Sequence, residues 1–402
     1  MTRAIPEINE RSSTGKEVLT NPSRIADRVW NLNLSEKIDG LTWWWWWWIF
    51  FFDNPDDPEH PRQLMILWST KNCDRIKVMD FDWERKGQVV RDQDPVTKEN
   101  RMKFNGMTAV WYYDGKTMYD PFLLKESGFE VNWKNSGELK PDSPEDLSFF
   151  GGPDNYTVRI QNLDKGMDFT FKLSPWNEFM STPRYASRNY SGKYGYNILR
   201  FYGMNLEGTL STPNSREELS GTAYFQKVMV NAPSIPWYWV VLQSEKGHYI
   251  DYFRPHIGFQ MLRRTKAPRS WMDRDGLPLS KGLQFYNPDT DILHRFKKMT
   301  VKKTFIPGPI SEDSTAGEEL PVFHVEASNT EGETISLVLE SYSRAYWRFE
   351  QKFWKIFKSI LYYNEYPVVL KSFKYEGLDG TIVKEDLGKV VGNAEHAWGF
   401  LA

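Results

Sequence analysis

The feature that most constrains the fold is a run of ten apolar residues, Trp43 to Phe52, which opens with six consecutive tryptophans. Ten residues are too few for a helix to span a bilayer. The aromatic content and the Asp/Pro-rich turn that follows favour a β-strand, in which alternate side chains point to opposite faces. Each face then carries three tryptophans and must be buried against other parts of the protein or a ligand. We expect a hydrophobic core on one side and a ligand cavity or a second layer on the other.

Short aromatic or β-branched segments, separated by turn residues, recur along most of the 402-residue chain. This spacing, without regularly alternating helices, predicts an all-β protein of antiparallel barrels or sandwiches. The length predicts two domains. We place their boundary within Phe201–Gly208, so that residues 1–205 form an N-terminal and residues 206–402 a C-terminal β domain.

Charge, cysteine and histidine content and the absence of known motifs limit the kinds of partner and site that this chain is expected to have. The net charge of −2 offers no basic footprint, so nucleic acid is not an expected partner. Cys73 is the single cysteine and the start of the chain lacks an apolar leader, which together favour a cytoplasmic location. The six histidines lack metal-binding spacing, and no nucleotide-binding or nucleophile motif stands in a suitable context. We therefore expect a site without metal or cofactor. Aromatic residues make up 16% of the chain, which suits either an apolar ligand or a plain core.

Residues 340–363 differ from the rest, because apolar residues recur there at helical spacing with lysines and arginines between them. The pattern predicts an amphipathic helix. Such a helix suits a membrane surface and would make the protein peripheral to the membrane. The alternative is a helix that packs its apolar side on a barrel and leaves its charges in water.

Asp251 lies in an almost wholly aromatic segment, between Trp237–Trp239 upstream and Tyr252-Phe253 downstream. A carboxyl group held among aromatic rings resists ionisation and can donate a proton near neutral pH. The rings could also stabilise a cation formed by that donation. The alternative is an ordinary strand residue that caps a turn or pairs with Arg254.

Three segments in order, Gly221–Val228, Pro236–Trp239 and Gly247–Asp251, resemble the carotenoid 1,2-hydratase and AttH-like lipocalin superfamily. Tyr375-Glu376-Gly377 and Gly392–Glu395 resemble that superfamily's closing pattern. The first half of the chain is similar only in composition and strand spacing. The resemblance implies two lipocalin-like barrels with an apolar pocket at or near their junction.

The hydratases of this superfamily add water to an isoprenoid double bond without a cofactor, through a Tyr-x-Asp pair that Tyr249 and Asp251 match. The resemblance implies that neutral Asp251 protonates the alkene. Tyr249, Gln226 or Lys227 would then orient the water. The implied substrate-binding residues are Trp237, Trp239, Tyr224, Gln226 and Lys227. Lys227 and Met229 replace a His-x-Trp pair of the carotenoid hydratases, which argues against a carotenoid. The chain is more similar to the archaeal branch of the superfamily, which is like hydroxyarchaeol synthase and acts on isoprenoid lipids.

Other functions stay open. The same superfamily includes Diels–Alderase-type pericyclases, which fold a polyene and need no strong acid, and members that could be plain lipid carriers. A pericyclase or a carrier would not need Asp251 in the pocket. Glu376 and Glu395 are second-choice acids, expected to serve structural roles.

Overall fold

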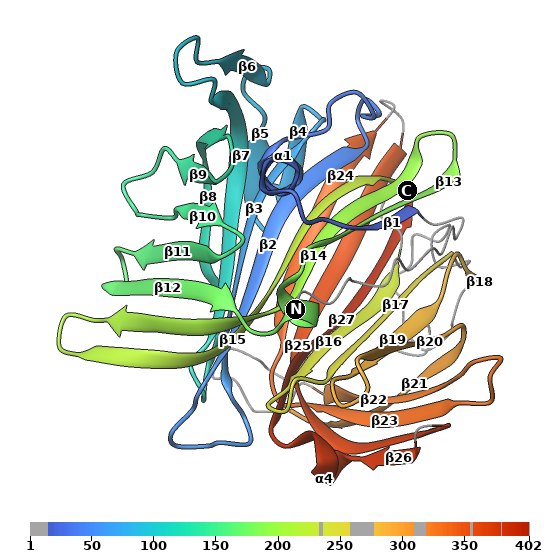
Figure 1. Ribbon diagram of the computed structural model, residues 1–402. Helices are drawn as coiled ribbons and strands as arrows, with labels where there is room; N and C mark the ends of the chain where they lie inside the picture. The colour runs from blue at the N-terminus through green and yellow to red at the C-terminus, as the bar shows by residue number, and fades with distance from the viewer. Residues whose placement is uncertain are drawn as a thin grey trace, which may run out of the picture.

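The computed structural model describes residues 15–232, 236–257, 277–308, 319–353, 357–378 and 380–401. Two large antiparallel sheets lie side by side and account for most of it (Figure 1). Only short helices accompany them in these residues: α1 (Pro22–Trp30), α2 (Glu178–Ser181) and α4 (Lys384–Leu387). The all-β expectation is confirmed.

The first sheet has 13 strands, and the pairing of its long strands β14 and β15 closes it into a barrel. Its strands are β1 (Gly15–Val18), β2 (Thr42–Phe52), β3 (Arg62–Lys71), β6 (Val90–Gln93), β7 (Asn100–Tyr113), β8 (Met118–Trp133), β9 (Gly137–Pro141), β10 (Phe149–Gly152), β11 (Asn155–Asn162), β12 (Met167–Pro175), β13 (Arg184–Ser191), β14 (Tyr194–Ser211) and β15 (Arg216–Asn231).

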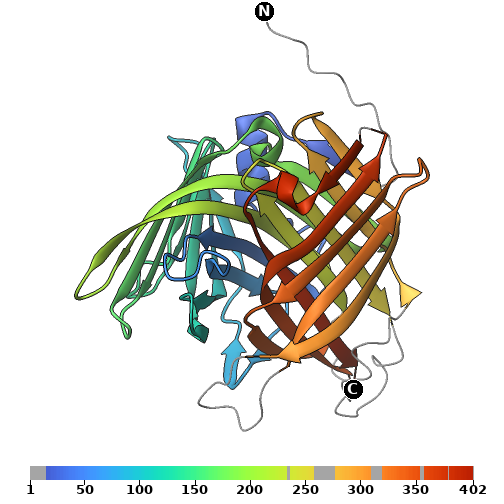
Figure 2. The ribbon, with the colours of Figure 1, turned by 90° about the horizontal axis from the view of Figure 1, so that it is seen from below.

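The second sheet has 14 strands and curves around a core of its own (Figure 2). Its strands are β4 (Arg75–Val78), β5 (Phe81–Glu84), β16 (Trp237–Ser244), β17 (Tyr249–Ile257), β18 (Leu277–Pro278), β19 (Gly282–Asn287), β20 (Ile292–Phe296), β21 (Lys298–Pro307), β22 (Glu319–Ser328), β23 (Thr334–Ser341), β24 (Ala345–Phe353), β25 (Phe357–Gly377), β26 (Gly380–Val383) and β27 (Val390–Leu401).

The two sheets do not divide the chain at one point. The boundary expected between residues 205 and 206 lies inside β14, which stays in the first sheet, as does β15 up to Asn231. In the other direction, β4 and β5 from the first half of the sequence pair with β24 of the second sheet. The division into two domains remains a prediction.

The tryptophan run forms β2 and alternates as expected. Trp44, Trp46 and Trp48 lie in the core of the first barrel. The opposite face carries Trp47, Ile49 and Phe51, which belong to a third hydrophobic cluster that takes residues from both sheets. We call this cluster the junction. From the first sheet it includes Trp47, Ile49, Phe51, Met65, Trp111, Tyr202 and Tyr224, and from the second Trp239, Val241, Tyr249, Trp347, Phe349, Leu361 and Ala397.

The helix predicted over residues 340–363 is wrong. This segment contains the end of β23, then β24, then the start of β25, with residues 354–356 outside the described part. β24 pairs with both β25 and β4, and its buried residues Ala345, Trp347 and Phe349 recur at every second position. Pairing with a strand on each side therefore determines the local structure. The amphipathic helix on which the expected membrane contact depended is not formed. Among the described residues, no helix is long and apolar enough to cross a membrane.

Candidate functional site at the junction of the two sheets

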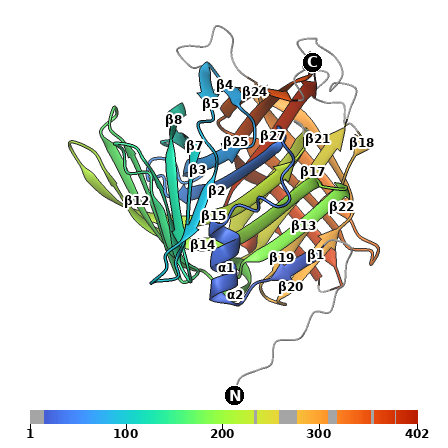
Figure 3. The same ribbon diagram turned by 90° about the horizontal axis from the view of Figure 1, so that it is seen from above.

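The predicted site residues mostly gather at the junction, to which β2, β14 and β15 of the first sheet and β16, β17 and β27 of the second contribute side chains. Figure 3 shows the first three strands together with β17 and β27. Strands β17, β16, β27 and β25 are consecutive neighbours in the second sheet. Because alternate residues of paired strands share a face, Asp251, Val241 and Asn393 form one row across this sheet. Phe253, Trp239, Glu395 and Glu365 form the next row.

Asp251 is 3% exposed and accepts three hydrogen bonds. Arg200 donates to its Oδ2 at 2.8 Å, the Tyr249 hydroxyl to the same oxygen at 3.0 Å, and Gln284 Nε2 to Oδ1 at 2.8 Å. A guanidinium and two neutral donors stabilise the charged form of a carboxyl group. Asp251 is therefore bonded to a guanidinium and two neutral donors rather than held among aromatic rings alone. Its ion-pair partner is Arg200, not Arg254.

Arg200 is the residue that sequence reasoning missed. It lies directly opposite Gln226 in the β14–β15 pair, and therefore on the junction side of the first barrel. A β-bulge follows it between Phe201 and Met204 and shifts the alternation of β14. Odd-numbered residues face the barrel core before the bulge, as Phe201 does, and even-numbered ones after it, as Met204 does. Gly203 lies in this bulge, where a Cβ atom would come within 2.8 Å of both Met180 and Trp176.

The two tyrosines beside Asp251 keep their protons. Burial raises the pKa of Tyr249 well above its ordinary value, and the Asp251 charge adds to this effect. Burial raises the pKa of Tyr224 in the same way, against the opposing charge of Arg200. Tyr224 donates to Gln226 Oε1 at 3.3 Å, and Tyr202 stacks on Tyr249 with 4.3 Å between ring centroids. The expected residues Tyr249, Tyr224 and Gln226 therefore form one polar group with Asp251.

The two predicted tryptophans lie farther along the same sheet face. Trp239 packs edge-on to Trp47, with ring centroids 5.5 Å apart, and contacts Tyr224 at 5.4 Å. Trp237 is partly exposed and donates its indole N–H to Glu395 Oε2 at 2.7 Å. Trp239 therefore stands between the Asp251 group and a second polar group around Glu395.

Lys227 does not join the site. It follows Gln226 on β15, so its side chain points to the opposite face, into the first barrel. There it donates to the carbonyl oxygen of Asn31 and lies over the Trp46 ring at 4.8 Å. Burial lowers the pKa of this amine well below its ordinary value. The prediction that Lys227 binds substrate beside Asp251 is therefore corrected by strand parity.

Glu395 and Glu365 form a buried carboxyl pair. They are directly opposite in the β25–β27 register and are 4% and 0% exposed. The Tyr363 hydroxyl donates to Glu395 Oε1 at 2.6 Å, and Asn393 Nδ2 donates to Glu365 Oε2 at 3.2 Å. Burial raises the pKa of both carboxyl groups, and the neighbouring charge of Glu395 raises that of Glu365 further. The other second-choice acid, Glu376, is exposed and paired with Lys374, which lowers its pKa.

Several buried polar atoms near this pair have no hydrogen-bond partner within the described part of the chain. They are Glu365 Oε1, Asn393 Oδ1, Trp47 Nε1 and Trp111 Nε1. The two indoles lie close enough to Glu365 to oppose the rise of its pKa. Buried polar groups are usually satisfied by protein, water or ligand, so these four atoms are exceptions within the junction.

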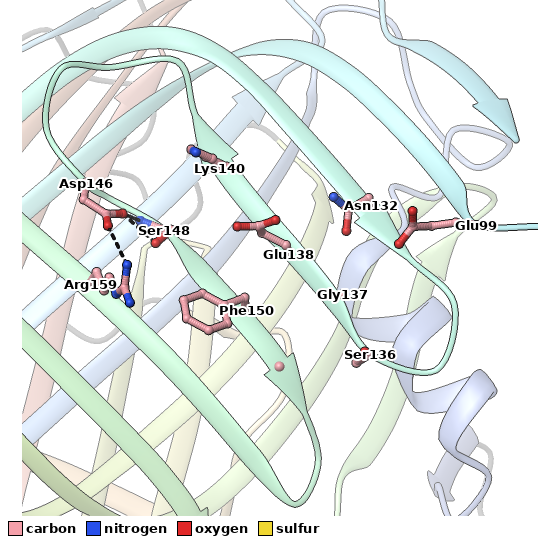
Figure 4. Close-up of a pocket in the computed structure, with 11 residues that line it drawn as sticks. Glu99, Asn132, Ser136, Gly137, Glu138, Lys140, Asp146, Ser148, Phe150 and Arg159 are labelled. Carbon is pink, nitrogen blue, oxygen red and sulfur yellow. Dashed lines mark hydrogen bonds and ion pairs between the residues drawn. The ribbon is translucent and has the colours of Figure 1, made fainter. Parts of the chain in front are cut away.

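The surface hollow in Figure 4 is a different place. Charged and polar side chains of the first barrel line it, and two of them, Asp146 and Arg159, form an ion pair at 3.1 Å. None of the predicted site residues lines it. Over the described ranges, no group of three or more His, Cys, Asp or Glu side chains is placed to hold a metal ion.

Comparison with known proteins gives a distant likeness of the whole chain. No family model matches the sequence. No curated protein matches it either. Among solved structures, a Nitrosomonas europaea protein described as a candidate AttH (NE1406) is 12% identical, with 98% of each chain covered and a TM-score of 0.49. Kievitone hydratase from Nectria haematococca is 10% identical, with 92% of this chain and 94% of that chain covered and a TM-score of 0.37.

Proposed function

We propose that this protein is a cofactor-independent hydratase that adds water to a carbon–carbon double bond of an isoprenoid chain at the junction. The observation that carries the proposal is the position of Asp251. Its carboxyl group is buried at the junction, where Asp251, Tyr249 and Trp239 of the second sheet meet Tyr224, Gln226 and Trp47 of the first. Charge, hydroxyl groups and aromatic rings therefore meet in one apolar layer.

Each part of this layer has a role in hydration. The aromatic residues Trp239, Tyr224 and Trp47 bind the apolar chain, and their rings stabilise a cation by about 0.5–2 kcal/mol each. Asp251 accepts a proton from the attacking water, while Tyr249 and Gln226 orient that water. Trp237 lies at the partly exposed end of the same face, beside Glu395.

Lipid mass spectrometry tests this function. The chain is expressed beside a pathway that makes unsaturated polyprenyl lipids, and the lipids are compared with those of cells lacking it. Hydration adds the mass of one water. A pericyclase would change retention but not mass, and a carrier would change neither, so either result contradicts the proposal.

A further inference from the structure

We propose that Glu365 and Glu395 share one proton near neutral pH and that this pair, not Asp251, protonates the alkene. Asp251 is then the base of the same reaction. The inference rests on the proposed hydration and adds the identity of the acid. That acid is a pair of carboxyl groups, not a single one.

The pairing geometry makes two charges at this position unfavourable. Side chains directly opposite in an antiparallel pair have Cβ atoms about 4.5–5.5 Å apart, and like charges there destabilise the sheet. Burial removes the water that would screen them. Two buried carboxyl groups held at directly opposite positions typically retain one proton between them. Tyr363 is the titratable side chain that contacts the pair, and it donates to Glu395.

The neighbours of the pair do not neutralise it as Arg200 neutralises Asp251. Glu395 accepts from the Trp237 indole and the Tyr363 hydroxyl, which are uncharged donors. Burial holds the pKa of Tyr363 well above its ordinary value, so this hydroxyl stays protonated. The uncharged surroundings favour the neutral acid, in agreement with the raised pKa of both glutamates.

The two kinds of carboxyl group are placed for complementary roles. Asp251 lies on β17 and Glu395 on β27, with β16 between them. Two strand spacings and an offset of two residues along the strand correspond to roughly 12 Å between the Cα atoms. In inverting glycosidases an acid and a base about 6.5–9.5 Å apart leave room for substrate and water. A double bond over Trp239 would have the neutral pair on one side and the Asp251 carboxylate on the other.

The reaction balances with these groups alone. The O–H bond of the glutamic acid breaks as a C–H bond forms at the less substituted alkene carbon, which leaves a carboxylate and a tertiary carbocation. A water oxygen bonds to the cation as its O–H proton passes to Asp251. That proton returns to the glutamate pair through solvent, so the net change is alkene plus water to tertiary alcohol.

Infrared spectroscopy of the substrate-free protein tests the shared proton. A protonated carboxyl group has a C=O stretch that a carboxylate lacks. We expect such a band at neutral pH in the wild type, and its loss in the double variant Glu365→Gln, Glu395→Gln. Asp120, whose pKa burial raises to about 7, contributes a band of its own, so the difference between the two proteins is the readout. Identical spectra would overturn the proposal.

The matched control is Glu333→Gln. Glu333 is also a buried glutamate that accepts from a tyrosine hydroxyl, Tyr375 at 2.8 Å, but it lies between β22 and β23, away from the junction, and its pKa is lowered. This variant should keep the infrared band. It shows whether losing any buried glutamate alters the spectrum.

Turnover separates the acid role from the function itself. Glu395→Gln and the double variant should lower hydration by about 10²–10⁴-fold, the usual worth of a general acid, while Glu333→Gln keeps it. If the wild type hydrates the lipid and the double variant does so at a similar rate, the acid role of the pair is overturned but the proposed function is not. Absence of hydration by the wild type would overturn the proposed function and, with it, proton donation to an alkene. Where the double variant fails to fold, the wild type is compared with Asp120→Asn, which removes the other expected band and should keep the band of the pair.

Discussion

Arg200 Nη1 lies 2.8 Å from Asp251 Oδ2, and this ion pair connects β14 of the first sheet with β17 of the second. Both side chains are largely buried, at 12% and 4% exposure. The ion pair therefore links the two sheets at the candidate site.

Arg200→Met should therefore be strongly destabilising, because it leaves the Asp251 charge buried and unpaired. Breaking a buried ion pair costs about 3–5 kcal/mol. Urea denaturation measures the free energy of unfolding. The control is Arg159→Met, whose half-exposed pair with Asp146 should contribute at most about 1 kcal/mol. Equal losses for the two variants would show that the Arg200 pair is not effectively buried.

The glutamate pair predicts how stability depends on pH. The pKa of Glu365 is raised in the folded chain, whereas the unfolded chain has the ordinary value near 4.5. As pH rises above that ordinary value, the unfolded chain loses its proton first and folding stability falls until the raised folded value is passed. Glu365→Gln removes this dependence. Its free energy of unfolding relative to the wild type should increase from acid to neutral pH, and a difference that stays constant or decreases would contradict the raised pKa.

Neighbouring tryptophans on opposite faces of β2 should separate stability from function. Trp46→Leu and Trp47→Leu both remove a fully buried ring and should both lower the melting temperature. Only Trp47 faces the junction. Loss of its ring should slow hydration by about 2- to 30-fold, the equivalent of about 0.5–2 kcal/mol of cation stabilisation. Turnover that falls equally in both variants would place the reaction elsewhere.

The adjacent pair Gln226 and Lys227 gives a second comparison. Gln226→Leu should lower turnover, because it removes a polar group beside Tyr224. Lys227→Met should leave turnover unchanged and raise stability at neutral pH, since the buried amine has a lowered pKa and the unfolded chain binds its proton more tightly. A lower free energy of unfolding for Lys227→Met would show that the bond to Asn31 outweighs this effect.

Features that depend on the alternation of residues within one strand could be predicted from the sequence. Features that depend on pairing between distant segments could not. The faces of the Trp43–Trp48 strand follow from strand parity alone, and the all-β class follows from the spacing of short aromatic and β-branched segments. The β24 segment was assigned to a helix because its rings also match helical spacing, and the partners that make it a strand, β4 and β25, come from both halves of the chain.

The candidate site shows the same limit. Tyr249 and Asp251 are two residues apart, so their hydrogen bond was foreseeable. Arg200 is 51 residues from Asp251, and no local pattern indicates their contact. The opposition of Glu365 and Glu395 likewise depends on the register of β25 and β27. Lys227 was misplaced because its parity relative to Gln226 was not applied.

The most direct measurement is hydration of an unsaturated isoprenoid lipid by the purified chain in isotopically labelled water, comparing wild type with Asp251→Asn. The control is Asp146→Asn, another arginine-paired aspartate but one outside the junction. We predict a product carrying the labelled oxygen from the wild type and from Asp146→Asn, and a rate at least about 10²-fold lower from folded Asp251→Asn. Near-normal product formation by folded Asp251→Asn, or no labelled product from the wild type, would contradict the assignment of hydration to this site.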